Sequence, residues 1–315
     1  MNRKKILITY DVPDWAYHKN AKILQEYLSD NFEIDIVGDQ DKRWILKALS
    51  QKKYDMLFLQ WVPDLELFTK HVTFPPDYQC KVISQVTSEV FFRKYRQGWR
   101  EYQEAPLLIT KSKEYFNKLS DVFPAEKIRL AYHVNDYNLF KPFELGKSHR
   151  EFKSRDKFRV GYVGRDCAVA NENKGHFFIR DACNLIGKEK VEYCVAGFDN
   201  RLSYKEMVDF YKSLDVVVCA SNHEGAPNSM LEAGLCGVPI ITTRVGQIQE
   251  MITDEESGLF CERNELSIKD KIEALMYNNE LYDKISVNLG LLSREWAKNA
   301  ITQWENVFKE LLNNE

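Results

Sequence analysis

LDVVVCASNHEGAPNSMLEAGLCGVPIITTR, residues 214–244, contains the pattern that decides the fold. Two short apolar runs, LDVVVCAS and PIITTR, enclose a polar turn and an apolar segment of helical character. The order strand, helix, strand is typical of a parallel sheet, because parallel neighbours need a crossover connection. Strands this apolar are expected to be buried on both faces. The stretch therefore predicts an α/β domain.

The same alternation runs through most of the chain. Strands of a first series are predicted at residues 5–10, 32–38, 55–61, 81–86, 105–112 and 127–132. Strands of a second series are predicted at residues 158–164, 191–197, 214–221 and 239–244. Residues 141–157 are charged and lack periodicity, which indicates a connection between domains. Residues 294–314 carry apolar side chains at helical spacing, which predicts an amphipathic terminal helix.

Composition limits the class of protein. The chain has 315 residues and a net charge of -3, so no global basic field indicates nucleic acid as a partner. Its seven cysteines form no CxxC pair, which favours a reducing compartment. No stretch reaches the ~18 apolar residues of a membrane span. We expect a soluble, cytoplasmic protein.

Two acids flank the turn that leads into the predicted helix. Glu224 precedes the turn, and Glu232 lies about one turn into the helix, which begins near Asn228 or Ser229. Free N–H groups and the dipole at a helix start favour phosphate, and Gly225 permits close approach of a ligand. A carboxylate at Glu232 is suited to a vicinal diol such as ribose. A nucleotide diphosphate sugar has both the phosphates and the diol that these groups would bind. The alternative is that Glu232 only stabilises the helix dipole and that Glu224 is a surface acid.

A neighbouring strand adds two cations. FRVGYVG ends in Gly164 and is followed by Arg165, and Lys174 lies at the start of the next helix. A departing diphosphate carries charge that an arginine and a lysine can neutralise without a metal. No Asp-x-Asp pair lies in a loop positioned to hold a divalent ion. The alternative for Arg165 and Lys174 is solvated surface charge.

At this point the residues resemble a known family. EGAPNSMLEAGLCGVP closely matches the signature EG-x-P-N-x-x-L-E-A-x-x-x-G-x-P of family four of the retaining nucleotide-sugar glycosyltransferases. VGR with NKGH, VGQIQEMITDEESGLF and AYHVNDYNLFKP resemble further elements of that family. The resemblance implies the GT-B fold, with two Rossmann-like α/β domains facing each other across a cleft. These would be residues 1–145, an acceptor domain, and 146–292, a nucleotide-sugar domain, with a helix over 293–315 crossing back to the first.

The resemblance also implies roles for individual residues. Glu224, Arg165 and Lys174 would be catalytic, the two cations gripping the diphosphate, and Glu232 would hold the ribose. The other residues on the donor side would be Gly164, Gly225, Asn228, Ser229, Met230 and Leu231. The implied reaction is retaining transfer from a nucleotide sugar, with UDP the expected nucleotide, and with neither metal nor cofactor. Front-face attack, in which the leaving phosphate oxygen helps to take the acceptor proton, is the mechanism commonly drawn for the family.

The first domain departs from the family. YDVPDWAYHKNA replaces the usual Gly-Gly loop, and Gln85 stands near the place of a catalytically associated histidine. Gln247 replaces the second glycine of another Gly-Gly pair. Asp14, Trp15 and His18, with Gln85, are the candidate acceptor residues; a capped helix start is the alternative for the first three. His133, in the segment between the domains, is suited either to approach the donor or to a structural role.

The expected partners are a nucleotide sugar and a glycan, lipid-linked or other hydroxyl acceptor, with no nucleic acid, as in cell-surface polysaccharide biosynthesis. Residues 89–103 interleave four basic with five aromatic side chains. They suit either peripheral contact with an anionic membrane at its inner face or a packed helix with a solvated basic side. A partner glycosyltransferase is a further candidate. The alternative to an enzyme is a catalytically inactive, nucleotide-sugar-binding accessory subunit, which would retain the donor residues.

Overall fold

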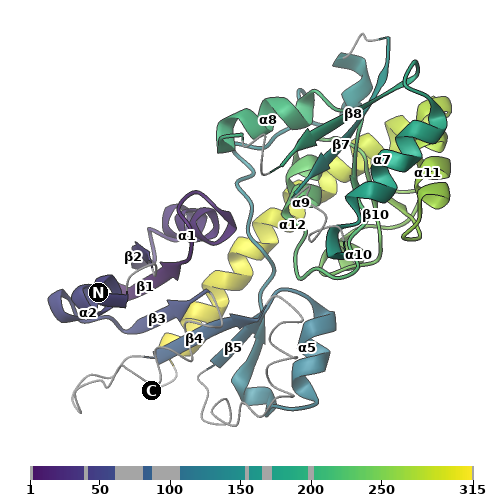
Figure 1. Cartoon of the computed structure of the whole chain (residues 1–315). Coiled ribbons are helices and arrows are strands. Elements are labelled where there is room, and N and C mark those ends of the chain that lie inside the picture. Colours follow the sequence, from purple (N-terminus) through teal and green to yellow (C-terminus); the bar gives the residue numbers. More distant parts are fainter. Residues whose placement is uncertain are drawn as a thin grey trace. The chain divides into compact units, whose positions relative to one another are not determined.

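The computed structural model describes residues 3–38, 42–60, 81–86, 107–152, 156–164, 172–197 and 202–313. It contains two compact units, each built on its own parallel sheet (Figure 1). The first unit comprises residues 1–134 and 299–315, and the second comprises residues 135–298. The domain boundaries expected from the sequence are 145/146 and 292/293, whereas the units divide at 134/135 and 298/299. Residues 89–103 lie outside the described part of the chain.

The first unit holds a six-stranded sheet in the order β2-β1-β3-β4-β5-β6, and every strand pair is parallel. Its elements are β1 (Lys4–Tyr10), α1 (Ala16–Tyr27), β2 (Phe32–Gly38), α2 (Lys42–Gln51), β3 (Met56–Leu59), β4 (Lys81–Val86), β5 (Leu107–Thr110), α5 (Lys113–Ser120), the 3₁₀ turn η2 (Ala125–Lys127) and β6 (Ile128–Leu130). The strands predicted in the first series are therefore confirmed: β2 and β4 have the predicted bounds, β1 is one residue longer, and β3, β5 and β6 are shorter.

Both faces of the first sheet are buried. Leu7 pairs with Leu57 in register, and both belong to one apolar cluster. Phe58, the next residue of β3, contacts Trp304 instead, with ring centroids 5.1 Å apart. Trp304 is fully buried and donates its indole N–H to the carbonyl oxygen of Tyr132 at 2.8 Å. Successive side chains of a strand thus point to opposite faces of the sheet, and both faces are covered, as a parallel sheet requires.

The second unit holds a five-stranded parallel sheet in the order β11-β10-β9-β7-β8. Its elements are the 3₁₀ turn η3 (His149–Phe152), β7 (Phe158–Val163), α7 (His176–Ile186), β8 (Val191–Ala196), α8 (Tyr204–Lys212), β9 (Val216–Cys219), α9 (Asn228–Leu235), β10 (Ile240–Thr242), α10 (Ile248–Met251), β11 (Leu259–Phe260), α11 (Glu265–Tyr277) and α12 (Asn279–Asn313). Helix α12 continues past residue 298, and its last part belongs to the first unit. The terminal helix starts earlier than its amphipathic spacing predicts.

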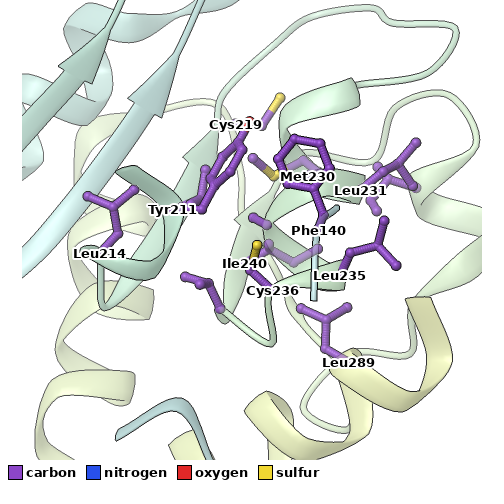
Figure 2. Close-up of a cluster of buried hydrophobic side chains, with 14 of the residues drawn as sticks. Phe140, Tyr211, Leu214, Cys219, Met230, Leu231, Leu235, Cys236, Ile240 and Leu289 are labelled. Carbon is purple, nitrogen blue, oxygen red and sulfur yellow. The ribbon is translucent and has the colours of Figure 1, made fainter. Parts of the chain in front are cut away.

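Strand β9 shows why the second sheet forms. Val216 and Val218 pack in a cluster with apolar side chains of α7 and α11. Val217 and Cys219 point to the other face and pack in a cluster with Met230 of α9 (Figure 2). All four side chains are buried, because every second residue of a strand faces the same side and helices cover both sides. The prediction of a strand buried on both faces is confirmed.

The segment expected to connect the domains, residues 141–157, falls within the range of the second unit. His149 is buried, its backbone N–H donates to Ser286 Oγ at 2.8 Å, and its Nε2 lies 3.0 Å from the carbonyl oxygen of Leu214. Ser148 donates to Asp283 Oδ1 at 2.5 Å. Such polar contacts anchor residues 148–149 without any apolar periodicity, so the sequence pattern did not reveal their burial.

Among the helices that the structure describes, none combines the length and the apolar character that crossing a membrane requires.

Candidate functional site

The chain enters α7 against the loop that follows β9. Strands β7 and β9 are parallel neighbours, so the segments after them leave the same edge of the sheet. Gly175, the residue before α7, has a φ of 64°, and a Cβ there would lie 2.4 Å from the carbonyl oxygen of Ala220. Only glycine permits this approach without displacing backbone. The two segments are therefore in direct contact.

Asn173 joins these segments by three hydrogen bonds. Its carbonyl oxygen accepts from the backbone N–H of Asn222 at 2.8 Å. Its side-chain Oδ1 accepts from the backbone N–H of His223 at 3.2 Å, and its Nδ2 donates to the carbonyl oxygen of His223 at 3.3 Å. An asparagine amide mimics a peptide group, so the arrangement resembles one rung of a sheet ladder. It sets the position of the next residue, Lys174.

Lys174 and Glu224 form an ion pair, with Nζ 2.5 Å from Oε1. The same carboxylate oxygen accepts from Ser221 Oγ at 2.8 Å, and the carbonyl oxygen of Ser221 accepts from Thr243 Oγ1 at 2.6 Å. The Lys174 side chain is 34% exposed and the Glu224 side chain 15% exposed. Both charges are thus held in place and still reachable by a ligand. The structure brings together two of the three predicted catalytic residues.

The turn between Glu224 and α9 is fixed from behind. Gly246 has a φ of 50°, and a Cβ there would lie 2.5 Å from the carbonyl oxygen of Gly225 and 2.6 Å from that of Glu224. The backbone N–H of Gln247 donates to the carbonyl oxygen of Gly225 at 3.0 Å. Gly225 is buried, because the turn at Gly246 and Gln247 packs against its backbone. The glutamine that departs from the family pattern still supplies a backbone donor.

Helix α9 begins at Asn228, where the sequence predicts a helix start, and Pro227 is its N-cap residue. The backbone N–H groups of Met230 and Leu231 donate to the carbonyl oxygen of Pro227, at 3.0 and 3.4 Å, and their side chains lie in the core. Helix geometry gives the N–H groups of Asn228 and Ser229 no earlier carbonyl within the helix. These two half-buried residues are therefore the positions from which α9 can offer N–H groups to an anion.

Glu232 lies one turn further along α9 and is 8% exposed. The hydroxyl of Tyr211, from α8, donates to Glu232 Oε2 at 2.7 Å. Burial raises the pKa of Tyr211 well above its ordinary value, and the neighbouring Glu232 carboxylate raises it further. The phenol therefore stays protonated and acts as a donor. No local pattern in the sequence pointed to Tyr211.

The remaining donor-side predictions lie at the end of β7. Gly164 follows the strand with a φ of 154°, and its backbone N–H donates to the carbonyl oxygen of Ala196 at 3.1 Å. Arg165 lies outside the described residues. Its predicted grip on a diphosphate stays a prediction.

Asp14, Trp15 and His18 lie together where the chain enters α1. The backbone N–H of Asp14 donates to His18 Nδ1 at 2.8 Å, and the His18 ring stacks on Tyr10 with centroids 4.0 Å apart. Burial lowers the pKa of His18, and Lys22 lowers it further, so the neutral ring accepts this hydrogen bond rather than forming an ion pair with Asp14. Trp15 is half-buried at the N-cap of the helix. The contacts are those of a structured helix start.

Gln85 lies elsewhere on the first sheet, at the end of β4, which β3 separates from β1. Its side chain is fully buried, and neither amide atom has a hydrogen-bond partner among the described residues. Buried amides are normally paired, so this one marks a polar position at the carboxyl edge of the sheet. The acceptor role expected of Gln85 stays a prediction.

Comparison with protein families finds a match within the second unit. Residues 196–289 match the family model described as Glycosyl transferases group 1. An uncharacterized glycosyltransferase of Methanocaldococcus jannaschii is 32% identical over 114 residues, covering 35% of this chain and 32% of that protein. The capsular polysaccharide biosynthesis glycosyltransferase CapM of Staphylococcus aureus is 26% identical over 176 residues, covering 47% and 46%. The chain thus spans less than half the length of these relatives.

A solved structure resembles the chain over nearly its whole length. Anabaena HepE, in its complex with UDP-glucose, gives a TM-score of 0.73 at 15% identity, covering 97% of this chain and 99% of that one. At this identity the likeness shows the fold alone, and the fold is GT-B, with two parallel-sheet α/β domains. Through residues 196–289, the part of the second unit that contains Glu224, the chain resembles the group 1 glycosyl transferases, and its fold is GT-B.

Proposed function

We propose that the protein is a retaining glycosyltransferase that moves a sugar from a nucleotide diphosphate sugar, most simply a UDP-sugar, to a hydroxyl of a glycan or glycoconjugate. The observation that carries this proposal is the reachable Lys174–Glu224 pair beside the start of α9. A cation, an acid and free helix N–H groups at one sheet edge match a ligand that has both a diphosphate and sugar hydroxyls. Glu232, held by Tyr211, supplies the carboxylate for the ribose diol.

In the proposed reaction the bond between the sugar C1 and the diphosphate oxygen breaks while the acceptor oxygen bonds to C1 from the same face. The acceptor proton passes to the departing phosphate oxygen. Lys174, joined by Arg165, neutralises the charge that develops on the diphosphate, and the N–H groups of Asn228 and Ser229 add to this stabilisation. Glu224 orients the sugar hydroxyls. We propose that these groups act without a metal or a cofactor.

We further propose that the first unit binds the acceptor and that the protein works in the cytoplasm, where it could meet a lipid-linked acceptor at the inner face of the membrane. The likeness to CapM supports a role in cell-surface polysaccharide synthesis. The fully buried Gln85 amide favours a second candidate, an accessory subunit that binds a nucleotide sugar without turning it over. An amide near the place of the family's histidine cannot exchange a proton at neutral pH.

A nucleotide-sugar panel, assayed for binding, for hydrolysis without acceptor and for transfer, separates these two functions. An enzyme should hydrolyse or transfer at least one donor, with activity that survives EDTA and a product that keeps the anomeric configuration. Lys174→Ala and Glu224→Gln should each reduce turnover by about 100-fold or more, since removing one charge-stabilising group commonly costs that much. Lys188→Ala, an exposed lysine of the same unit, is the matched control. Binding without any turnover would establish the accessory function instead.

A further inference from the structure

Arg263 joins the two segments that carry Lys174 and Glu224. It lies between β11 and α11 and is half-buried. Its Nε donates to the carbonyl oxygen of Ala220 at 2.9 Å, and its Nη2 donates to the carbonyl oxygen of Glu172 at 2.7 Å. Ala220 directly follows β9, and Glu172 precedes α7. One guanidinium therefore bonds to both segments at once.

These two carbonyl groups are close in the chain to the charged pair. Glu172 lies two residues before Lys174, and Ala220 lies four residues before Glu224. Because consecutive Cα atoms are only about 3.8 Å apart, a shift of either carbonyl is passed to the charged side chains with little slack. A planar guanidinium presents donors in a fixed fork, whereas a lysine ammonium is a single point. Arginine is thus suited to setting the spacing of the two segments.

The base of Arg263 is itself fixed. The backbone N–H of Cys261 donates to the carbonyl oxygen of Thr242 at 3.0 Å. Asn264 caps α11, accepting from the backbone N–H of Ser267 at 2.8 Å. The guanidinium also lies over the ring of Phe178 in α7, 5.2 Å from its centroid. The side chain therefore extends from a rigid strand–helix junction and is held along its length.

A cavity of about 420 Å³ lies beside this guanidinium, and its lining includes Ser221, Asn222, Arg244 and Arg263. Arg244 shares the cavity and the charge, but its guanidinium lies over the ring of Phe260 at 3.8 Å. This guanidinium therefore packs on β11, whereas that of Arg263 bonds to the segments that carry the pair. Arg244 provides a matched control for Arg263.

We propose that Arg263 is a positioning residue of the donor site, which holds Lys174 and Glu224 at contact distance by bonding to the carbonyl groups of Glu172 and Ala220. The inference rests on the proposed function, because the pair is assigned to the nucleotide sugar there. In this role Arg263 acts on the reaction through the two backbone segments to which it is bonded.

The test is a double-mutant cycle with the donor that the panel identifies. Arg263→Ala should reduce kcat/KM by about 10- to 100-fold, the scale of a displacement of about 1 Å at a catalytic group. In the Lys174→Ala background the same change should cost only a few-fold, because one of the two groups that Arg263 positions is already gone and the ion pair with it. Arg244→Ala should leave kcat/KM near the wild-type value. Arg263→Lys should fall between alanine and arginine, and it replaces Arg263→Ala in the cycle if the alanine variant does not fold.

Chemical rescue gives a readout that general loss of stability would not produce. Millimolar guanidinium chloride should restore part of the activity of Arg263→Ala, since the adjacent cavity admits the ion, whereas equal sodium chloride should not. Rescue should be absent from Lys174→Ala. Equal effects of Arg263→Ala and Arg244→Ala, or full additivity with Lys174→Ala, would overturn the proposal while wild-type turnover stands. A wild-type protein that neither binds nor turns over any nucleotide sugar would instead defeat the proposed function, and this inference with it.

Discussion

The hydroxyl of Tyr211 donates to Glu232 Oε2 at 2.7 Å, and both side chains are buried. Tyr211 comes from α8 and Glu232 from α9, so the contact links two helices on one face of the second sheet. A buried carboxylate that keeps such a donor has a defined orientation. Under the proposed function, this is the orientation in which Glu232 would meet the ribose diol.

Tyr211→Phe should therefore weaken both folding and donor binding. The change leaves a buried carboxylate oxygen without its donor, which costs about 1–3 kcal/mol of the free energy of unfolding. Denaturant titration should show this loss, and calorimetry should show a higher Kd for UDP. Tyr193→Phe is the control, because the contact between its hydroxyl and the carbonyl oxygen of His176 is long, at 3.5 Å. An unchanged Kd for UDP in Tyr211→Phe would show that Glu232 does not bind the nucleotide.

Gly246→Ala tests the packing behind the Glu224 turn. An alanine at a φ of 50° pays about 1–2 kcal/mol for the left-handed conformation, and its Cβ would also meet two carbonyl oxygens within 2.6 Å. Gly146→Ala has a φ of 83° and nothing within 4 Å of the new Cβ, so it reports the conformational cost alone. We expect Gly246→Ala to lose more unfolding free energy than Gly146→Ala, and to lose turnover as well. Equal losses in the two variants would show that the turn relaxes freely.

Much of the second unit could be predicted because its signals are local. The apolar run of β9 and the turn before α9 are each read within a few residues. The closeness of Lys174 and Glu224, 50 residues apart, could also be predicted, since the loops that follow parallel strands lie at the same edge of the sheet. The closeness of the pair follows from topology rather than from any local pattern.

Other parts of the site have no such signal. Tyr211 and Arg263 look like ordinary residues of a helix and a strand–helix junction, and their partners are set by how distant segments pack. Arg263 reaches carbonyl groups 43 and 91 residues away, and backbone carbonyls leave no mark in the sequence. Residues 148–149 were missed for a similar reason, because hydrogen bonds to α12 hold them and apolar periodicity does not.

The five described cysteines predict how the native protein reacts with thiol reagents. Cys183, Cys194, Cys219, Cys236 and Cys261 are all buried and free. Burial raises the pKa of Cys183, Cys236 and Cys261 to about 12, so almost none of their thiolate forms at pH 8. Peptide mapping after brief alkylation at pH 8 should find these three unmodified in native protein and modified after denaturation. Rapid native labelling of Cys183 or Cys236 would show that their surroundings open readily.

The first unit contains a buried basic pair, Lys111 and His133. Their Nζ and Nδ1 atoms lie 2.6 Å apart, and Lys111 Nζ also lies over the Tyr17 ring at 5.8 Å. Burial lowers the pKa of Lys111 from 10.5 to about 7, and burial together with Lys111 lowers the pKa of His133 well below 6.5. At least one member of the pair is therefore neutral at neutral pH. The contact is a hydrogen bond rather than a repulsion between two cations.

This pair makes folding depend on pH with a definite sign. Between pH 10.5 and about 7, Lys111 is protonated in the unfolded chain and neutral in the folded chain. The free energy of unfolding therefore falls as the pH falls through this range. Below about pH 6.5 His133 adds a loss of the same sign. Lys111→Met removes the loss of unfolding free energy that is due to Lys111. The variant should therefore have a higher free energy of unfolding than wild type, and the difference should be larger at pH 7 than at pH 9. Denaturant titrations at both pH values measure the difference, with Lys113→Met, an exposed neighbour, as control. A difference between Lys111→Met and wild type that does not change over this range would mean that the Lys111 ammonium stays charged inside the fold.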